Sequence, residues 1–178
     1  MRTKAVAVLV SVFMLACGAT LCGEPAAPLA SLEPALQEAL ERDAVCSEKS
    51  PSPGVPVATQ AIVAGGRKAG VIASPQDPCH CKRENCSTFV YVKSGERFQL
   101  ELADMFASIR PMKIAKHGLP SLSAKFQLDE LREETTIFDW NGQGYEPSLC
   151  ATVSKRPNQR VPSIVKHQCR TSARTIPR

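Results

Sequence analysis

The sequence lacks the short motifs that mark most nucleotide-binding proteins and serine hydrolases. Gly65-Gly66 is not followed by the Lys-Ser or Lys-Thr ending of a phosphate-binding loop, and no Gly-x-Ser-x-Gly occurs. Histidine, the commonest catalytic base, is scarce, and none of its three occurrences lies in a nucleophile signature: His80, His117 and His167. We therefore predict a protein without catalytic activity and without a cofactor.

A hydrolase that uses carboxylates is the first alternative, because the two carboxylates of a glycosidase need closeness in space and not in sequence. The candidates lie beside one expected strand and in one charged loop: Glu101, Asp104, Asp129, Glu130, Glu133 and Glu134. The simpler interpretation of the loop is a solvated charged connection.

Long hydrophobic runs are also scarce, and the clearest one is short and N-terminal. Arg2 and Lys4 precede an apolar run over residues 5–16, and small residues follow it. This order is typical of a secretory signal peptide, and the run is well short of the ~20 residues of a membrane-spanning helix. We predict a signal peptide over residues 1–23, a Pro/Ala-rich tether over residues 24–30, and a periplasmic or secreted mature chain.

Cys17 lies at the end of this run and is a candidate for lipidation. Ala16 and Gly18 flank it as in a bacterial lipobox, but the two residues before Ala16 depart from that pattern. Cleavage a few residues further on, without lipid, is the alternative. Attachment to a membrane is expected only if Cys17 carries a lipid.

Six cysteines remain after such cleavage, and an even number in an exported chain indicates disulfides. Six cysteines allow 15 pairings. We favour a tight Cys81–Cys86 loop, a Cys46–Cys79 bond that ties the helix to the sheet, and a Cys150–Cys169 bond that fixes the tail.

The cluster Cys79-His80-Cys81 also has two chemical interpretations. Thiolates at Cys-x-Cys can bind copper or zinc, although the spacing differs from that of a structural zinc site and no matching second pair occurs. Nor is it the Cys-x-x-Cys of a thioredoxin-like redox site. A metal-binding protein is therefore the second alternative to the predicted function.

Alternating segments with regular turn signals predict a mainly β fold, an antiparallel sheet or small sandwich with one short N-terminal helix, stabilised by disulfides. Ser31 is expected to cap the helix, and residues 31–55 hold this helix and a Pro/Ser-rich linker. The β domain is expected over residues 56–150. Asn141-Gly142 is expected to form a two-residue type I′ turn that places Trp140 and Tyr145 face to face.

Three stretches in a fixed order carry a resemblance to a family. A cysteine-rich turn precedes "STFVYVKSGERFQL", and "HGLPSL" and "IFDWNGQGYEP" follow. Over residues 79–147 this order resembles that of a group of small exported bacterial proteins, in which Ser121 and Asn141 are both replaced by Asp. The resemblance implies export and β architecture, and it transfers no catalytic residue.

The net charge of +5 is concentrated at the C-terminus, where residues 148–178 hold seven Lys or Arg and no acid. This basic tail, expected over residues 151–178, indicates attraction to an anionic envelope component or to a protein. Nucleic acid is not expected, because the tail has no aromatic residue to stack on bases. The predicted function is binding, as an inhibitor, an immunity protein or an accessory envelope protein. The candidate binding residues are Trp140, Tyr145, Lys155, Arg156 and Arg160.

Overall fold

The structure is a computed structural model that describes residues 25–155 and 161–169. The predicted signal peptide with Cys17, and the candidate binding residues Arg156 and Arg160, lie outside the described residues. The described residues form eleven strands, one α-helix and one short 3₁₀ helix. All strand pairs are antiparallel, so the predicted fold class is confirmed.

The first sheet contains the N-terminal strands, in the order β1-β2-β3-β5-β4, with β6 also paired to β5. Two antiparallel hairpins, β2–β3 and β5–β6, each turn at a Gly-containing connection. The strands are β1 (Ala27–Pro28), β2 (Pro56–Ala64), β3 (Arg67–Pro75), β4 (Cys81–Lys82), β5 (Asn85–Ser94) and β6 (Arg97–Phe106).

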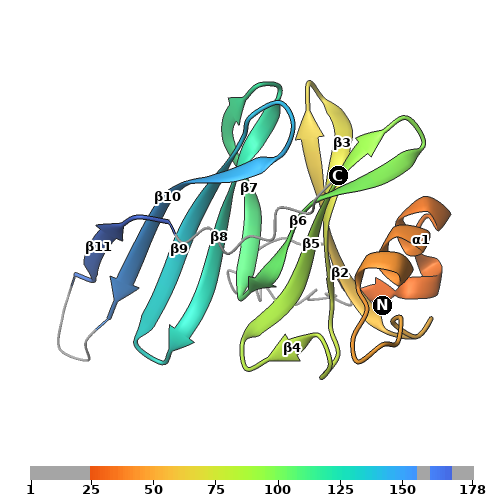
Figure 1. The fold of residues 1–178 in the computed structure, drawn as a ribbon, viewed down its shortest axis with the longest axis horizontal. Coiled ribbons are helices and arrows are strands. Elements are labelled where there is room, and N and C mark those ends of the chain that lie inside the picture. The colour runs from red at the N-terminus through yellow and green to blue at the C-terminus, as the bar shows by residue number, and fades with distance from the viewer. Residues whose placement is uncertain (1–24, 156–160, 170–178) are drawn as a thin grey trace, which may run out of the picture.

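The second sheet contains the remaining strands in the order β11-β10-β9-β8-β7, and it lies beside the first sheet in Figure 1. Its strands are β7 (Ser108–Lys116), β8 (Leu119–Asp129), β9 (Arg132–Trp140), β10 (Tyr145–Ser154) and β11 (Ser163–His167). The expectation that the β domain ends at residue 150 is therefore wrong. Part of the predicted tail pairs with β10 because the disulfide and the alternation of that segment hold it in the sheet.

The first sheet is covered on both faces, which follows from alternation along β5. Phe89 and Tyr91 point to one side, where they pack with helix α1 (Pro34–Asp43), and Tyr91 Oη donates a hydrogen bond to Ala39 O at 3.3 Å. Val90 points to the other side and packs with residues of the second sheet. The result is three layers, with α1 on the outer face of the first sheet (Figure 1).

The N-terminal segment departs from the sequence prediction in two ways. Leu29 is fully buried in the helix-side core, and β1 pairs with β2, so the described part of the expected tether, residues 25–30, is held against the domain. Ser31 does not cap α1, because it lies in the 3₁₀ helix (Leu29–Ser31) and its hydroxyl donates to Pro28 O. Glu33 occupies the N-cap position without a side-chain hydrogen bond.

Trp140 and Tyr145 lie in the core between the two sheets. Their rings are 5.2 Å apart in an edge-to-face arrangement, as the predicted hairpin requires. They are 9% and 5% exposed, and Tyr145 Oη donates to Pro120 O, so these two candidate binding residues belong to the core and form no exposed recognition surface. The predicted two-residue turn is also wrong. Four residues connect the strands, because the Asn141 side chain accepts hydrogen bonds from the backbone N–H groups of Gln143 and Gly144 and rounds the loop.

Three disulfides join the same pairs that the sequence analysis favours: Cys46–Cys79, Cys81–Cys86 and Cys150–Cys169. The first ties the segment after α1 to the segment after β3, and the third ties β10 to the residues after β11. Such bonds fit an oxidising, extracellular compartment.

Candidate functional site

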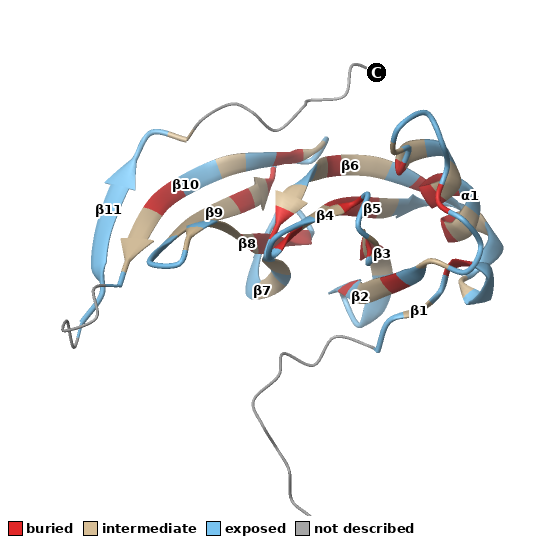
Figure 2. Cartoon of the chain, turned by 90° about the horizontal axis from the view of Figure 1, so that it is seen from below, coloured by how far each residue is buried: buried red, intermediate tan, exposed pale blue. Residues whose placement is uncertain are grey.

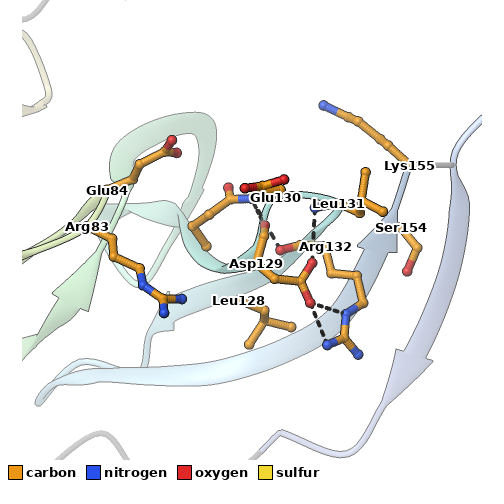
Figure 3. A pocket seen from close by; sticks show the side chains of 10 residues that line it. Arg83, Glu84, Leu128, Asp129, Glu130, Leu131, Arg132, Ser154 and Lys155 are labelled. Atoms are coloured by element: carbon orange, nitrogen blue, oxygen red, sulfur yellow. Dashed lines mark hydrogen bonds and ion pairs between the residues drawn. The ribbon is translucent and has the colours of Figure 1, made fainter. Parts of the chain in front are cut away.

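An open hollow of about 1000 Å³ lies where the two sheets meet at one end of the molecule (Figure 3). One wall is the turn that the Cys81–Cys86 disulfide closes, which we name the stapled turn (residues 81–86). The other walls are the β8–β9 turn, residues 127–132, and the end of β10 with Ser154 and Lys155.

The stapled turn presents Arg83 and Glu84 at its tip, because Cys81 pairs with Cys86 and Lys82 pairs with Asn85. Arg83 has a φ of 56°, in the left-handed region where residues other than glycine are uncommon. A backbone held in this region typically persists only where the surrounding structure fixes it. Here the disulfide on one side and Asn85 on the other do so, and Arg83 reaches toward the β8–β9 turn (Figure 3).

Asn85 joins the stapled turn to the second sheet. Its Nδ2 donates to Gln127 O at 2.9 Å, and its Oδ1 accepts from the Gln127 backbone N–H at 2.8 Å. The pairing of β7 with β8 begins only at Lys125, so Gln127 lies beyond it. The buried Asn85 side chain therefore takes the place of a neighbouring strand and fixes the distance between two walls of the hollow.

The β8–β9 turn is fixed by Asp129. Its carboxylate accepts from Arg132 Nε at 2.6 Å and from the Leu131 backbone N–H at 3.0 Å. The Arg132 hydrogen bond holds the pKa of Asp129 below its usual range, and the same pair raises the pKa of Arg132. Lys155 is placed next to this turn because its backbone N–H donates to Leu131 O at 2.8 Å.

The charges that remain available in the hollow are of both signs. No ion pair within the described residues involves Arg83, Lys155, Glu84 or Glu130, and all four are exposed. Two exposed leucines, Leu128 and Leu131, lie between them. The hollow thus offers two cations, two carboxylates and an apolar patch on a rigid frame.

Of these residues, sequence reasoning identifies only Lys155 as a candidate for binding. Asp129 and Glu130 enter the sequence analysis as carboxylates for hydrolysis, but Asp129 is bound to Arg132. Arg83 and Glu84 are missed, although the cysteines that flank them carry the signal that this turn is rigid.

Each of the three histidines occupies a place that the fold explains. His80 is buried between two disulfides, with Nδ1 2.8 Å from Asp77 Oδ2 and Nε2 3.0 Å from Ala44 O. These two contacts hold the ring beside the end of α1. Burial raises the pKa of Asp77, but the hydrogen bonds from His80 and Cys79 outweigh it and lower that pKa overall. His117 is a turn residue with a φ of 49°, and His167 contacts Thr152.

Of the candidate carboxylates, Asp104 on β6 and Glu134 on β9 interact through their negative charges. Although Asp104 is exposed, neighbouring groups desolvate its carboxylate in part and so raise its pKa, and the charge of Glu134 raises it further. Glu133 is instead bound to Lys125 at 2.8 Å. A carboxylate whose pKa is raised by desolvation and by a second carboxylate is a feature that favours acid–base chemistry.

The cysteine cluster has no free thiolate, because Cys79 and Cys81 each bond to a different partner. No group of three His, Cys, Asp or Glu side chains within the described ranges has the arrangement of a metal site. The metal-site alternative for Cys79-His80-Cys81 therefore finds no support in the structure.

Comparison with known proteins found no relative of this chain. No protein-family model matches the chain, and searches of curated proteins and of solved structures found no similar protein. In the part of the chain that the structure describes, no helix has the length and apolarity to cross a membrane.

Proposed function

We propose that the protein is exported and binds another protein or an envelope component through the hollow, without catalysis. The observation that carries this proposal is the rigid wall that the stapled turn provides. The disulfide and the Asn85–Gln127 hydrogen bonds hold Arg83 and Glu84 in a conformation that does not have to be ordered when a partner binds. Preorganisation of this kind lowers the entropic cost of association.

The charges of the hollow favour a protein surface over a polyanion. Arg83 and Lys155 are matched by Glu84 and Glu130, so an extended anion would meet repulsion beside each attraction. A protein surface of mixed charge, with an apolar side chain opposite Leu128 and Leu131, would satisfy all of these groups. An inhibitor, an immunity protein and an accessory envelope protein all work by such contacts.

Export to the periplasm or medium is supported by the signal-like N-terminus and by the three disulfides. The family resemblance supports the same location and remains part of the proposal. Membrane attachment is proposed only for a chain lipidated at Cys17, which incorporation of radiolabelled palmitate would detect.

Affinity capture from an envelope extract tests the binding function. The immobilised mature chain is compared with two double variants of equal charge change, Arg83→Glu/Lys155→Glu in the hollow and Arg97→Glu/Lys113→Glu elsewhere on the surface. We expect a defined protein to be retained by the unchanged chain and by the second variant, and to be lost from the first. Equal loss from both variants would mean that net charge, and not the hollow, is recognised.

A carboxylate-based hydrolase is the second candidate, because desolvation and the charge of Glu134 raise the pKa of Asp104. Turnover on a panel of glycoside and ester substrates, abolished by Asp104→Asn, would favour it. No turnover on the panel would leave binding as the function.

A further inference from the structure

Strand β11 forms a regular free edge of the second sheet. Within the described residues it pairs with β10 on one side only, and all five of its residues are exposed (Figure 2). Ile164 and Val165 are 62% and 59% exposed. An edge strand with open backbone groups and exposed apolar side chains is a template on which a further strand can pair.

The opposite edge of the same sheet, strand β7, has features that block strand addition and that β11 lacks. Strand β7 contains Pro111, which has no N–H to donate, and its register with β8 shifts between Pro111 and Ala115. Exposed Lys113 follows within this irregular stretch. By contrast, β11 contains no proline and pairs with β10 without a register shift over its whole length. One edge is therefore closed to strand addition and the other is open.

The side chains of β11 define what an added strand would meet. Alternation places Ile164 and Lys166 on one face, beside Val153 and Ala151 of β10. Val165 lies on the other face with His167. An added strand therefore finds an apolar position on each face and a cation beside one of them, so it needs apolar side chains together with carboxylates.

Charge also decides whether the strand added to β11 comes from a second copy of this chain or from another protein. Residues 148–178, which include β10 after its first residues and all of β11, contain seven Lys or Arg and no acid. Two copies paired through β11 would bring these basic segments together, which like-charge repulsion disfavours. An acidic extended segment gains attraction from the same residues.

We propose that β11 receives an extended, acidic and apolar segment of a partner protein as an additional strand of the second sheet. This inference rests on the proposed function, because it gives the bound protein a second contact. Ser154, the last residue of β10, pairs with Ser163 of β11, and Ser154 and the following Lys155 also line the hollow. One partner can therefore place a segment on the edge and a folded surface in the hollow.

A fluorescent peptide of alternating Val and Glu serves as the probe, with an alternating Val and Lys peptide and a Val/Glu peptide N-methylated at its central residues as comparisons. Anisotropy titration of the mature chain is expected to show saturable binding of the Val/Glu peptide, about tenfold tighter than that of the Val/Lys peptide. N-methylation removes backbone donors and is expected to abolish binding. Amide hydrogen exchange of residues 163–167 is expected to slow in the complex.

Two charge reversals on the edges of one sheet provide the matched control. Lys166→Glu on β11 is expected to remove the preference for the Val/Glu peptide, whereas Lys113→Glu on β7 is expected to leave it unchanged. Absence of saturable binding, equal binding of the N-methylated peptide, or equal effects of both reversals would overturn the inference. So would a dimer of the mature chain that Lys166→Glu disrupts, because the occupant would then be a second copy.

The experiment separates this inference from the proposed function. If the Lys166→Glu chain still captures the partner and the Arg83→Glu/Lys155→Glu chain does not, the inference about β11 is overturned and the proposed binding in the hollow stands. If the peptide binds specifically at β11 and the Arg83→Glu/Lys155→Glu chain still captures the partner, the proposed binding in the hollow is overturned and the inference about β11 stands.

Discussion

The side-chain amide of Asn85 makes two hydrogen bonds to the backbone of Gln127, one as donor and one as acceptor. The two residues are 42 positions apart and belong to different sheets. Through this contact the stapled turn is docked on the edge of β8, and the hollow acquires a fixed width. The site therefore depends on a structural side chain that no ligand needs to touch.

Asn85→Ala is expected to lower the free energy of unfolding by about 2–3 kcal/mol, because it leaves a donor and an acceptor of the Gln127 backbone without partners in a partly buried place. Urea unfolding monitored by the fluorescence of Trp140 measures the change. Gln99→Ala, at an exposed position of β6, is the control and should change stability by less than about 0.5 kcal/mol. A cost for Asn85→Ala no larger than that of the control would show that the two walls are not coupled.

Gly70 lies where β3 approaches β5 so closely that no side chain fits. A Cβ at this position would overlap Tyr91 O, which is backbone and cannot move aside. Gly70→Ala is therefore expected to cost at least about 3 kcal/mol or to prevent folding. Gly54→Ala is the matched control, since a Cβ there meets nothing within 4 Å. Thermal unfolding of the two variants tests the difference, and similar melting temperatures would contradict the close approach.

The disulfides are expected to differ in their contribution according to the loops that they close. Cys46–Cys79 spans 33 positions and Cys81–Cys86 spans 5. Loop-closure entropy predicts a loss of about 4 kcal/mol for Cys46→Ser/Cys79→Ser and about 2 kcal/mol for Cys81→Ser/Cys86→Ser. Denaturant unfolding of both double variants measures these losses. A larger loss for the short loop would mean that the stapled turn stabilises the fold and does more than shape the hollow.

Asp139 is expected to make stability depend on acid pH. Lys116 and then Ser121 donate hydrogen bonds to its carboxylate at 2.5 and 2.6 Å, and these lower its pKa to about 2. Because the folded-state pKa is below the unfolded value, the stabilisation is complete above about pH 4 and is lost as the pH falls toward 2.

Asp139→Asn should therefore lower the free energy of unfolding by on the order of 1–2 kcal/mol at pH 7. The difference from the unchanged protein should shrink as the pH falls below 4. Unfolding curves at a series of pH values measure it. A difference that stays constant down to pH 2 would show that the carboxylate charge plays no part.

Much of the fold could be predicted because its signals are local. Alternating apolar residues and Gly-containing turns define the β2–β3, β5–β6 and β9–β10 hairpins, although the number of residues in the last turn depends on the Asn141 side chain. The cysteine pairing favoured among the 15 possibilities is also the one that the structure shows. By contrast, Leu29 is a single apolar residue in a Pro/Ala-rich segment, and no periodicity marks it as core.

The candidate site could not be predicted in the same way, because contacts distant in sequence create it. Arg83 and Leu131 become neighbours of one hollow only when Asn85 reaches Gln127. For the candidate binding residues Trp140 and Tyr145, the sequence alone leaves both core and surface open. Their aromatic character suits a recognition surface, but the second sheet folds over the first and buries both.

The central claim is that a partner binds in the hollow, and site-specific photo-crosslinking in the producing cell tests it most directly. A photoreactive residue at Leu131, which is 48% exposed in the hollow, is compared with one at Val63, which is 54% exposed near the β2–β3 turn at the opposite end of the molecule (Figure 1). We predict a discrete crosslinked species from position 131 and none from position 63. No crosslink from position 131, or the same species from both positions, would contradict the account.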